Sequence, residues 1–168
     1  LGEQKAKDLW PYQECIELFM IKINKENILG LILAGGQSKR MGNINKSLAI
    51  INNKSLLEIT LSLVKKQLNT VIINSNVRLN IANKYNLRII PDKIPGYLGP
   101  LSGILSGMEW AKKNFPECQW VASFPVDSIF FPNNFVEIMT NKINKKTQII
   151  CAKSKGRTHP VFALWSLD

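Results

Sequence analysis

The chain has 168 residues, of which 45% are hydrophobic, so it is long enough to form one domain with a sizeable buried core. Its net charge of +10 favours anionic ligands, but the lysines are scattered along the chain instead of forming one basic arm, which argues against a nucleic-acid-binding protein. The three cysteines are far apart and lack the spacing of metal ligands, which indicates reduced thiols in a cytoplasmic protein.

The N-terminal residues carry little functional signal. Residues 16–23 are partly apolar, but Glu17 and Lys22 interrupt the run and no small-residue cleavage site follows it. We therefore predict neither a secretory signal nor a membrane span, and no membrane among the partners.

Short apolar runs alternate with runs of helical period along the rest of the chain. Strands are predicted at residues 28–33, 70–74, 87–90, 120–124, 148–152 and 161–164. Helices are predicted between them at residues 55–67, 79–85, 101–114 and 133–143. This alternation predicts a three-layer α/β sandwich with a mostly parallel sheet and right-handed crossovers. The loops after the first four strands should then meet at the carboxyl edge of the sheet, where such folds bind ligands.

A glycine-rich loop with several cations follows the first predicted strand. Residues 33–46 read Leu-Ala-Gly-Gly-Gln-Ser-Lys-Arg-Met-Gly-Asn-Ile-Asn-Lys. Gly35 and Gly36 allow main-chain N–H groups to approach an anion closely. The cations that add positive charge are Lys39, Arg40 and Lys46. Because the spacing matches neither the Walker pattern nor a dinucleotide fingerprint, the loop alone fits a polyphosphate site of a nucleotide-using enzyme and a turn beside a solvated basic surface equally well.

Polar side chains mark the ends of three further strands. Asn74 and Asn76 stand at the end of the second predicted strand, Asp92 follows the third, and Asp127 follows the fourth. A carboxamide can donate and accept hydrogen bonds, and a carboxylate supplies the hard oxygen that Mg²⁺ prefers. Each residue also has a structural interpretation, since the asparagines could close a turn and the aspartates could cap a helix or loop. From the residues alone, metal binding and capping are equally good interpretations of Asp127.

Together these motifs resemble those of nucleotidyltransferases with a Rossmann-like domain. Molybdenum cofactor guanylyltransferases of the MobA type have the most similar loop, which here reads Leu33-Ala34-Gly35-Gly36-x-Ser38-x-Arg40-Met41-Gly42-x-x-x-Lys46. Five later segments match motifs of that family in the same order, namely Asn74-Ser75-Asn76, Pro91-Asp92, Gly99-Pro100-Leu101-Ser102-Gly103, Pro125-Val126-Asp127 and His159-Pro160. The resemblance extends over residues 28–165.

The resemblance implies an enzyme that transfers GMP from GTP to molybdopterin, forming the guanine dinucleotide cofactor and releasing pyrophosphate. It implies Mg²⁺ held by Asp127, and catalytic roles for Arg40, Lys46 and Asp127. The implied nucleotide contacts are Leu33, Ala34, Gly35, Gly36, Lys46, Asn74, Asp92 and Asp127. The stretch that the family places near the pterin phosphate contains Lys153, Lys155, Arg157 and His159. The implied partners are GTP, molybdopterin and, transiently, other molybdenum cofactor proteins.

Several features leave alternatives open. Asn45 stands where the family often has aspartate, so any role of that carboxylate is missing. Related cytidylyltransferases usually carry Leu-Ala-Ala-Gly, whereas Gly35 matches the guanine-using branch; other sugar- or alcohol-phosphate nucleotidyltransferases share the loop but not all later motifs. Family members usually continue past the His-Pro strand, so we expect residues 20–168 to be a nucleotidyltransferase domain truncated at its C-terminus, and residues 1–19 a tail or fusion remnant. The last alternative is an inactive domain that binds GTP without transferring it.

Overall fold

The computed structural model describes residues 23–35, 46–94, 96 and 99–168. Its main strands are β1 (Ile28–Leu33), β4 (Thr70–Asn74), β5 (Arg88–Ile90), β6 (Trp120–Pro125), β7 (Ile149–Ser154) and β8 (Arg157–Ser166). Its α-helices are α3 (Leu56–Lys65), α4 (Asn80–Lys84), α5 (Pro100–Asn114) and α6 (Phe135–Thr140). The short elements are η1 (Lys25–Asn27), η3 (Lys46–Leu48), β2 (Ile50–Ile51) and β3 (Lys54–Ser55). None of the helices in these ranges is long and apolar enough to cross a membrane.

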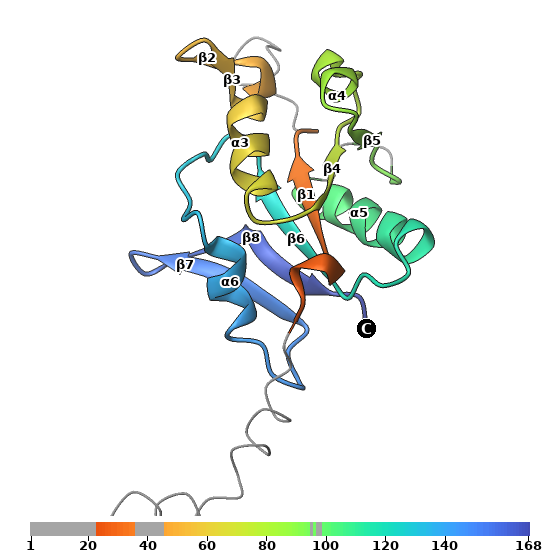
Figure 1. Ribbon diagram of the computed structural model, residues 1–168, viewed down its shortest axis with the longest axis vertical. Coiled ribbons are helices and arrows are strands. Elements are labelled where there is room, and N and C mark those ends of the chain that lie inside the picture. The colour runs from red at the N-terminus through yellow and green to blue at the C-terminus, as the bar shows by residue number, and fades with distance from the viewer. Residues whose placement is uncertain (1–22, 36–45, 95, 97–98) are drawn as a thin grey trace, which may run out of the picture.

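Six strands form one mixed sheet in the order β5-β4-β1-β6-β8-β7. β5, β4, β1 and β6 are parallel, and β8 pairs antiparallel with both β6 and β7. The chain moves outward from β1 to β4 and β5, and then returns through α5 to β6 on the other side of β1 (Figure 1). The mostly parallel sheet confirms the prediction. The strand order reverses between β1 and β6, and open α/β sheets bind ligands at the carboxyl ends of the strands at such a point.

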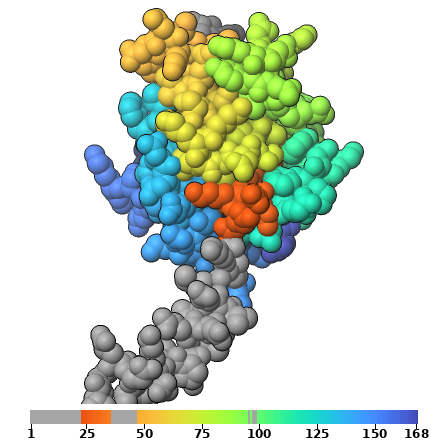
Figure 2. Space-filling view, in the orientation of Figure 1, coloured from red at the N-terminus to blue at the C-terminus, as the bar shows by residue number. Residues whose placement is uncertain are grey.

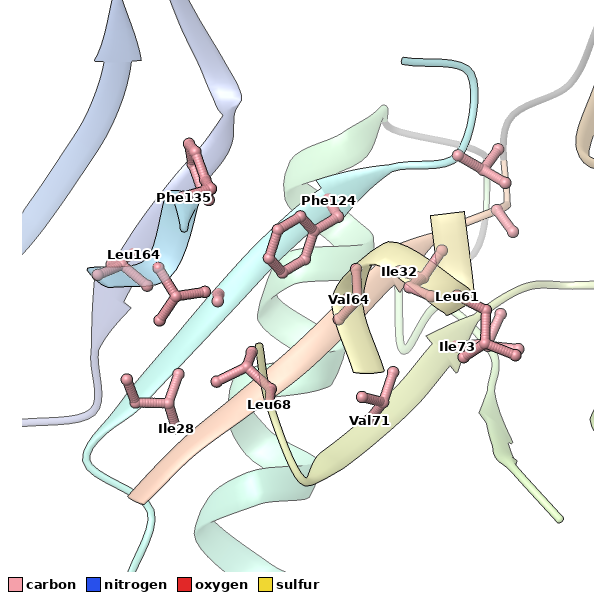
Figure 3. Packing of buried hydrophobic residues seen from close by; sticks show 14 of the residues in the cluster. Ile28, Ile32, Leu61, Val64, Leu68, Val71, Ile73, Phe124, Phe135 and Leu164 are labelled. Atoms are coloured by element: carbon pink, nitrogen blue, oxygen red, sulfur yellow. The ribbon is translucent and has the colours of Figure 1, made fainter. Parts of the chain in front are cut away.

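Helices cover both faces of this sheet, with α3 and α6 on one face and α5 on the other (Figure 1). Figure 3 shows Ile28, Ile32, Val64 and Phe124 among the side chains packed between α3 and the strands. The intervening β1 residues, such as Leu31, belong to the core on the α5 side. Figure 2 shows the yellow atoms around α3 at the centre of the face that this helix covers. Because β1 is covered on both faces, all of its residues are buried, as its continuous apolar sequence predicted.

A cluster of phenylalanine rings fixes the connection between β6 and α6. The ring centroid of Phe131 lies 5.3 Å from that of Phe124 on β6 and 5.5 Å from that of Phe162 on β8. Phe135, the first residue of α6, packs edge-on against Phe124 with centroids 5.7 Å apart. Edge-to-face pairs at such separations are favourable beyond their buried area. The segment that follows Asp127 is therefore anchored to the core.

The two long helices, α3 and α5, have different N-terminal capping arrangements. At the start of α3, Ser55 Oγ accepts from Glu58 N, and the Glu58 carboxylate accepts from Ser55 N at 2.9 Å, which is a capping box. The bond from the Ser55 N–H, followed by that from Lys84, lowers the pKa of Glu58. α5 begins at Pro100, one residue before the predicted start; proline suits this position because the first N–H groups of a helix have no partner within the helix.

The fold contains two antiparallel hairpins, of which β2–β3 was not predicted, whereas β7–β8 joins two strands that were predicted in succession. β2 and β3 are joined by Asn52 and Asn53, which both have positive φ, as tight hairpin turns require. β7 and β8 are joined in the same way by Lys155 and Gly156. The register of the β7–β8 pair shifts between residues 151 and 152, which marks a bulge in this pair at the edge of the sheet.

Candidate active site

The four parallel strands end side by side at one edge of the sheet. The pairing register places Asn74 between Ile90 and Leu33. It places Pro125 on the other side of Leu33. A main-chain bond from Ala34 N to Asn74 O, at 2.9 Å, continues the alignment beyond β1. The motif residues that follow these strand ends are therefore neighbours along one edge, as the parallel arrangement predicted.

A hydrogen-bonded cluster joins the ends of β4 and β5. Asn74 Nδ2 donates to Asp92 Oδ1 at 3.0 Å, and Asn76 Nδ2 donates to Asp92 Oδ2 at 2.8 Å. Asn76 Oδ1 also accepts from the main-chain N–H of Asp92 at 2.8 Å. Each oxygen of this half-buried carboxylate thus accepts one hydrogen bond from a side-chain amide. Because an ionised carboxylate offers about four acceptor sites, both oxygens keep capacity for a ligand.

The Asn74 side chain is only 3% exposed, and the protein uses both of its amide hydrogens. Besides the bond to Asp92, Nδ2 donates to Ile90 O at 3.3 Å. The sequence predicted that Asn74 could both donate to and accept from a nucleotide. Because both amide hydrogens are used within the protein, only the carbonyl oxygen of Asn74 remains for such a contact. A Cβ added to Gly35 would lie 3.2 Å from that oxygen, and a Cβ added to Gly103 would overlap with it. Glycine at both positions therefore lets the loop after β1 and the first turns of α5 close around Asn74.

The segment that carries Asp92 is also bonded to α5. Lys93 N donates to Ser106 Oγ at 2.8 Å, and Ser106 Oγ donates to Ser102 O at 2.8 Å. Lys93 Nζ also pairs with Glu109 at 2.6 Å, but both side chains are exposed, so this pair contributes little stability. The main chain is thus held immediately before Asp92 by β4 and immediately after it by α5.

Asp127 occupies the opposite end of the strand edge, beyond β6. Its side chain is exposed, and its contact within the protein is a 3.4 Å bond from Ser128 Oγ. α6 begins after Asn134, whose side chain makes no capping bond. The structure therefore does not support the capping interpretation of Asp127. Three strand spacings of about 4.8 Å separate β5 from β6, so about 14 Å lies between the strand ends that precede Asp92 and Asp127.

The surroundings of Asp127 fit a cation that arrives with a phosphate ligand. Among the described residues, no group of three or more His, Cys, Asp or Glu side chains is placed to hold a metal ion. The two ion pairs within the described ranges leave Asp127 out. Since proteins commonly hold Mg²⁺ with one or two carboxylates plus substrate phosphates, an exposed carboxylate without a cationic partner suits that ion.

The start of the glycine-rich loop lies between the two aspartates. Leu33 and Ala34 are 9% and 4% exposed, and the half-buried Gly35 follows them. Lys46 is the first residue of η3. The remaining predicted loop features lie outside the described residues, namely Gly36, Lys39, Arg40, Asn45 and the side chain of Lys46.

The β7–β8 hairpin carries the residues that the sequence assigned to the pterin phosphate. Ser123 pairs with Ala163, so the start of β8 at Arg157 lies beyond the carboxyl end of β6. Nε2 of the half-buried His159 lies 2.7 Å from Ser154 Oγ across the hairpin. The exposed cations of this hairpin are Lys153, Lys155 and Arg157. A basic hairpin therefore extends past the same edge of the sheet as Asp127.

Residues 30–167 match a family described as the MobA-like NTP transferase domain. The chain belongs to this family. A molybdenum cofactor guanylyltransferase of Rhodopseudomonas palustris is 34% identical over 136 residues, which are 80% of this chain and 64% of the relative. One of Mesorhizobium japonicum is 36% identical over 145 residues, which are 86% of this chain and 69% of the relative. The chain thus spans just under two thirds of the length of the first relative.

Two solved structures share the fold of this chain. The molybdopterin-guanine dinucleotide biosynthesis protein A of Archaeoglobus fulgidus matches with a TM-score of 0.63 at 17% identity, covering 83% of this chain and 67% of that protein. A 4-diphosphocytidyl-2C-methyl-D-erythritol synthase of Anaerococcus prevotii matches with a TM-score of 0.53 at 17% identity, covering 85% and 71%. These likenesses confirm the predicted nucleotidyltransferase-type α/β fold.

Two residues that hold this site, Asn76 and Ser106, were not predicted to do so. The sequence indicated only a turn or a family motif at Asn76, and it indicated no role for Ser106. The spacing of Asn74 and Asn76 held a usable signal, because residues two apart at a strand end project to the same side. Two carboxamides so placed can both reach a carboxylate on the neighbouring strand. No comparable local pattern identifies Ser106.

Proposed function

We propose that this MobA-like domain transfers GMP from GTP to molybdopterin and releases pyrophosphate. The observation that carries the proposal is the order along the strand edge: a carboxylate held by two amides, then a glycine-rich turn, then an exposed carboxylate. The base, phosphates and metal of a nucleoside triphosphate have the same linear order. The name of the relatives, molybdenum cofactor guanylyltransferase, supports a guanylyl donor and a molybdenum cofactor acceptor.

In this proposal Asp92 binds the guanine base. Guanine presents N1–H and the exocyclic N2 amine side by side, and two parallel donors match the two oxygens of a carboxylate. Asn74 and Asn76 occupy one acceptor site on each oxygen, which leaves one site per oxygen for the base. Cytosine and adenine do not present two adjacent donors on one edge, so this geometry favours guanine over both.

The triphosphate lies along the glycine-rich loop. The loop leaves β1 at Leu33 and Ala34, and its glycines, Gly35 and Gly36, permit main-chain N–H groups to face the phosphate oxygens. In this proposal Arg40 and Lys46 neutralise the charge that accumulates as the α-phosphorus is attacked.

Asp127 holds Mg²⁺ together with phosphate oxygens of GTP in this proposal. When bound, the ion supplies positive charge that stabilises the leaving pyrophosphate. Because Asp127 is exposed and bonded only to Ser128 among the described residues, its carboxylate can turn toward the phosphates without disturbing the core.

A phosphate oxygen of molybdopterin attacks the α-phosphorus of GTP, and the bond between the α-phosphorus and the bridging oxygen breaks to release pyrophosphate. The acceptor is itself the nucleophile, so the protein contributes positioning and charge. The hairpin residues that we assign to the acceptor are Lys153, Lys155, Arg157 and His159. We further infer transient contact with other molybdenum cofactor proteins and a cytoplasmic site of action, where the cysteines stay reduced.

Cytidylyl transfer is the principal alternative, and the contact between Gly35 and Asn74 argues against it. Alanine at position 35, as in the cytidylyltransferase loop, would place a Cβ 3.2 Å from Asn74 Oδ1. That separation is tighter than ordinary van der Waals contact, so Asn74 would have to move. Glycine at position 35 therefore matches the arrangement that holds Asp92.

Calorimetric titration with GTP, CTP and ATP in the presence of Mg²⁺ tests the base assignment. We expect GTP to bind at least about tenfold more tightly, the effect of one or two hydrogen bonds to a charged group. Equal or tighter binding of CTP would overturn the guanine assignment. Pyrophosphate release on addition of molybdopterin tests transfer, and GTP binding without that release would favour the non-transferring GTP-binding domain.

A further inference from the structure

The Asn76 side chain bonds only to residue 92 in the described structure. Its amide nitrogen donates to Asp92 Oδ2, and its carbonyl oxygen accepts from Asp92 N, both at 2.8 Å. A single carboxamide thus forms hydrogen bonds with both the side chain and the main chain of the same residue. This paired contact fixes both the position of the Asp92 backbone and the rotation of its carboxylate.

The two asparagines that hold Asp92 have different environments. Asn74 is buried, also bonds to Ile90 O, and lies against two glycines, so its replacement would disturb the packing of β1, β5 and α5. Asn76 is only half-buried, and its side chain bonds to no other residue in the described part of the chain. The main chain beside Asp92 keeps its own anchor, because Lys93 N is held by Ser106 Oγ. Asn76 is therefore suited to set the orientation of one carboxylate without being needed for the fold.

We propose that Asn76 is a positioning residue that fixes the Asp92 carboxylate for simultaneous bonds to N1–H and the N2 amine of guanine. This inference rests on the function proposed above, in which Asp92 binds the base. Without Asn76, Asp92 Oδ2 loses its amide donor, and the carboxylate can rotate about its terminal torsion, which is soft. A rotated carboxylate still accepts one bond from a base but no longer offers two oxygens in the plane of the guanine edge.

Inosine triphosphate separates one bond from two, because hypoxanthine keeps N1–H and lacks the N2 amine. With the carboxylate fixed, GTP should bind roughly 10- to 100-fold more tightly than inosine triphosphate, the effect of one hydrogen bond to a charged group. With the carboxylate free to rotate, the second bond is lost and the two nucleotides should bind with similar affinity. The ratio of the two dissociation constants therefore reports on orientation, which a general loss of stability would not change selectively.

The experiment compares the wild-type protein with Asn76→Ala by calorimetry with both nucleotides in Mg²⁺. We expect the affinity ratio to fall to within about threefold in the variant, with KM for GTP raised and kcat at saturating GTP nearly unchanged. Asn80→Ala is the matched control, because Asn80 is an exposed asparagine at the start of α4, and the wild-type ratio should persist there. A folded Asn76→Ala protein that keeps the wild-type ratio would overturn the inference.

A second variant, Asn76→Asp, keeps the size of the side chain and the acceptor for Asp92 N but replaces the donor by a negatively charged oxygen facing Asp92 Oδ2. We expect this variant to lose the ratio as well, and retention of the ratio would overturn the inference even if Asn76→Ala fails to fold. A wild-type protein that does not prefer GTP to CTP would instead refute the proposed function. A crystal structure of Asn76→Ala without nucleotide adds a separate check, since an unmoved Asp92 carboxylate would also overturn the inference.

Discussion

Asp92 and Asp127 both follow parallel strands of the same sheet, but their surroundings differ. Asp92 is half-buried and held by two asparagines, and α5 anchors the residue after it. Asp127 is exposed, and its side chain makes one long bond within the described residues, from its neighbour Ser128. In the proposed function, the end of the site that binds the base is thus prearranged by the protein, while the end that binds the metal depends on its ligand for order. If Asp92 selects the base as proposed, its rigidity lowers the cost of binding, and the freedom of Asp127 would allow charge to shift during transfer.

The largest expected effect is at the metal end. Asp127→Asn should lower Mg²⁺-dependent transfer by at least about 100-fold, because a neutral carboxamide binds a hard cation much less well than a carboxylate does. The melting temperature should stay within about 2 °C, since the residue is exposed and caps no helix. Turnover assays and thermal melting measure the two quantities. Near-normal turnover at ordinary Mg²⁺ would remove Asp127 from the site.

Lys46→Ala should weaken triphosphate binding by about 1–3 kcal/mol, the value of a charge-assisted contact. The GTP:CTP affinity ratio should be unchanged, because the phosphates are common to both nucleotides. Calorimetry with both nucleotides checks this, and Lys54→Ala, on the exposed strand β3, is the control. Unchanged affinity would identify Lys46 as a solvated lysine.

Gly103→Ala should disrupt the hydrogen-bonded cluster around Asp92. A Cβ at this position overlaps with Asn74 Oδ1, so Asn74 must move and weaken its bond to Asp92. Overpacking and the weakened bond should exceed the gain of alanine in a helix interior, for a net loss of about 1–2 kcal/mol in the free energy of unfolding. Urea denaturation measures this loss, with Leu101→Ala, an exposed change in the same helix, for comparison. A Gly103→Ala protein as stable as the wild type would show that the cluster tolerates displacement.

The smallest effect should lie away from both ends. Ser55→Ala removes the cap of α3 and should cost about 1 kcal/mol of stability while leaving the GTP:CTP ratio unchanged.

The same capping box should make stability depend on pH. The folded-state pKa of Glu58 is lowered, so its contribution is present above the ordinary glutamate pKa of about 4.3 and is lost as the pH falls through the lowered value. We expect denaturation measured from about pH 3 to about pH 7, a range that spans this pKa, to show a smaller loss of stability in acid for Glu58→Gln than for the wild type.

Local sequence pattern was sufficient for the central strands and insufficient for contacts between them. β1 and β4 match their predicted limits because continuous apolar runs of that length fit only strands covered on both faces. The hairpin turn at Asn52 and Asn53 was missed because its flanking strands have only two residues each. The bond between Asn76 and Asp92 joins residues 16 apart; the spacing of Asn74 and Asn76 places both amides on one side, but only the pairing of β4 with β5 identifies Asp92 as their partner. The position of Asp127 at the carboxyl edge of the sheet did follow from its place after a buried strand.

The position of β7 at the end of the sheet bears on how the protein behaves at high concentration. Among the described strands, β7 lies at the edge of the sheet and pairs on one side only, and such strands can pair with the same strand of another molecule. The exposed Lys153 on this strand places a charge where a second strand would approach. The strand that begins the basic hairpin therefore also carries a local protection against aggregation.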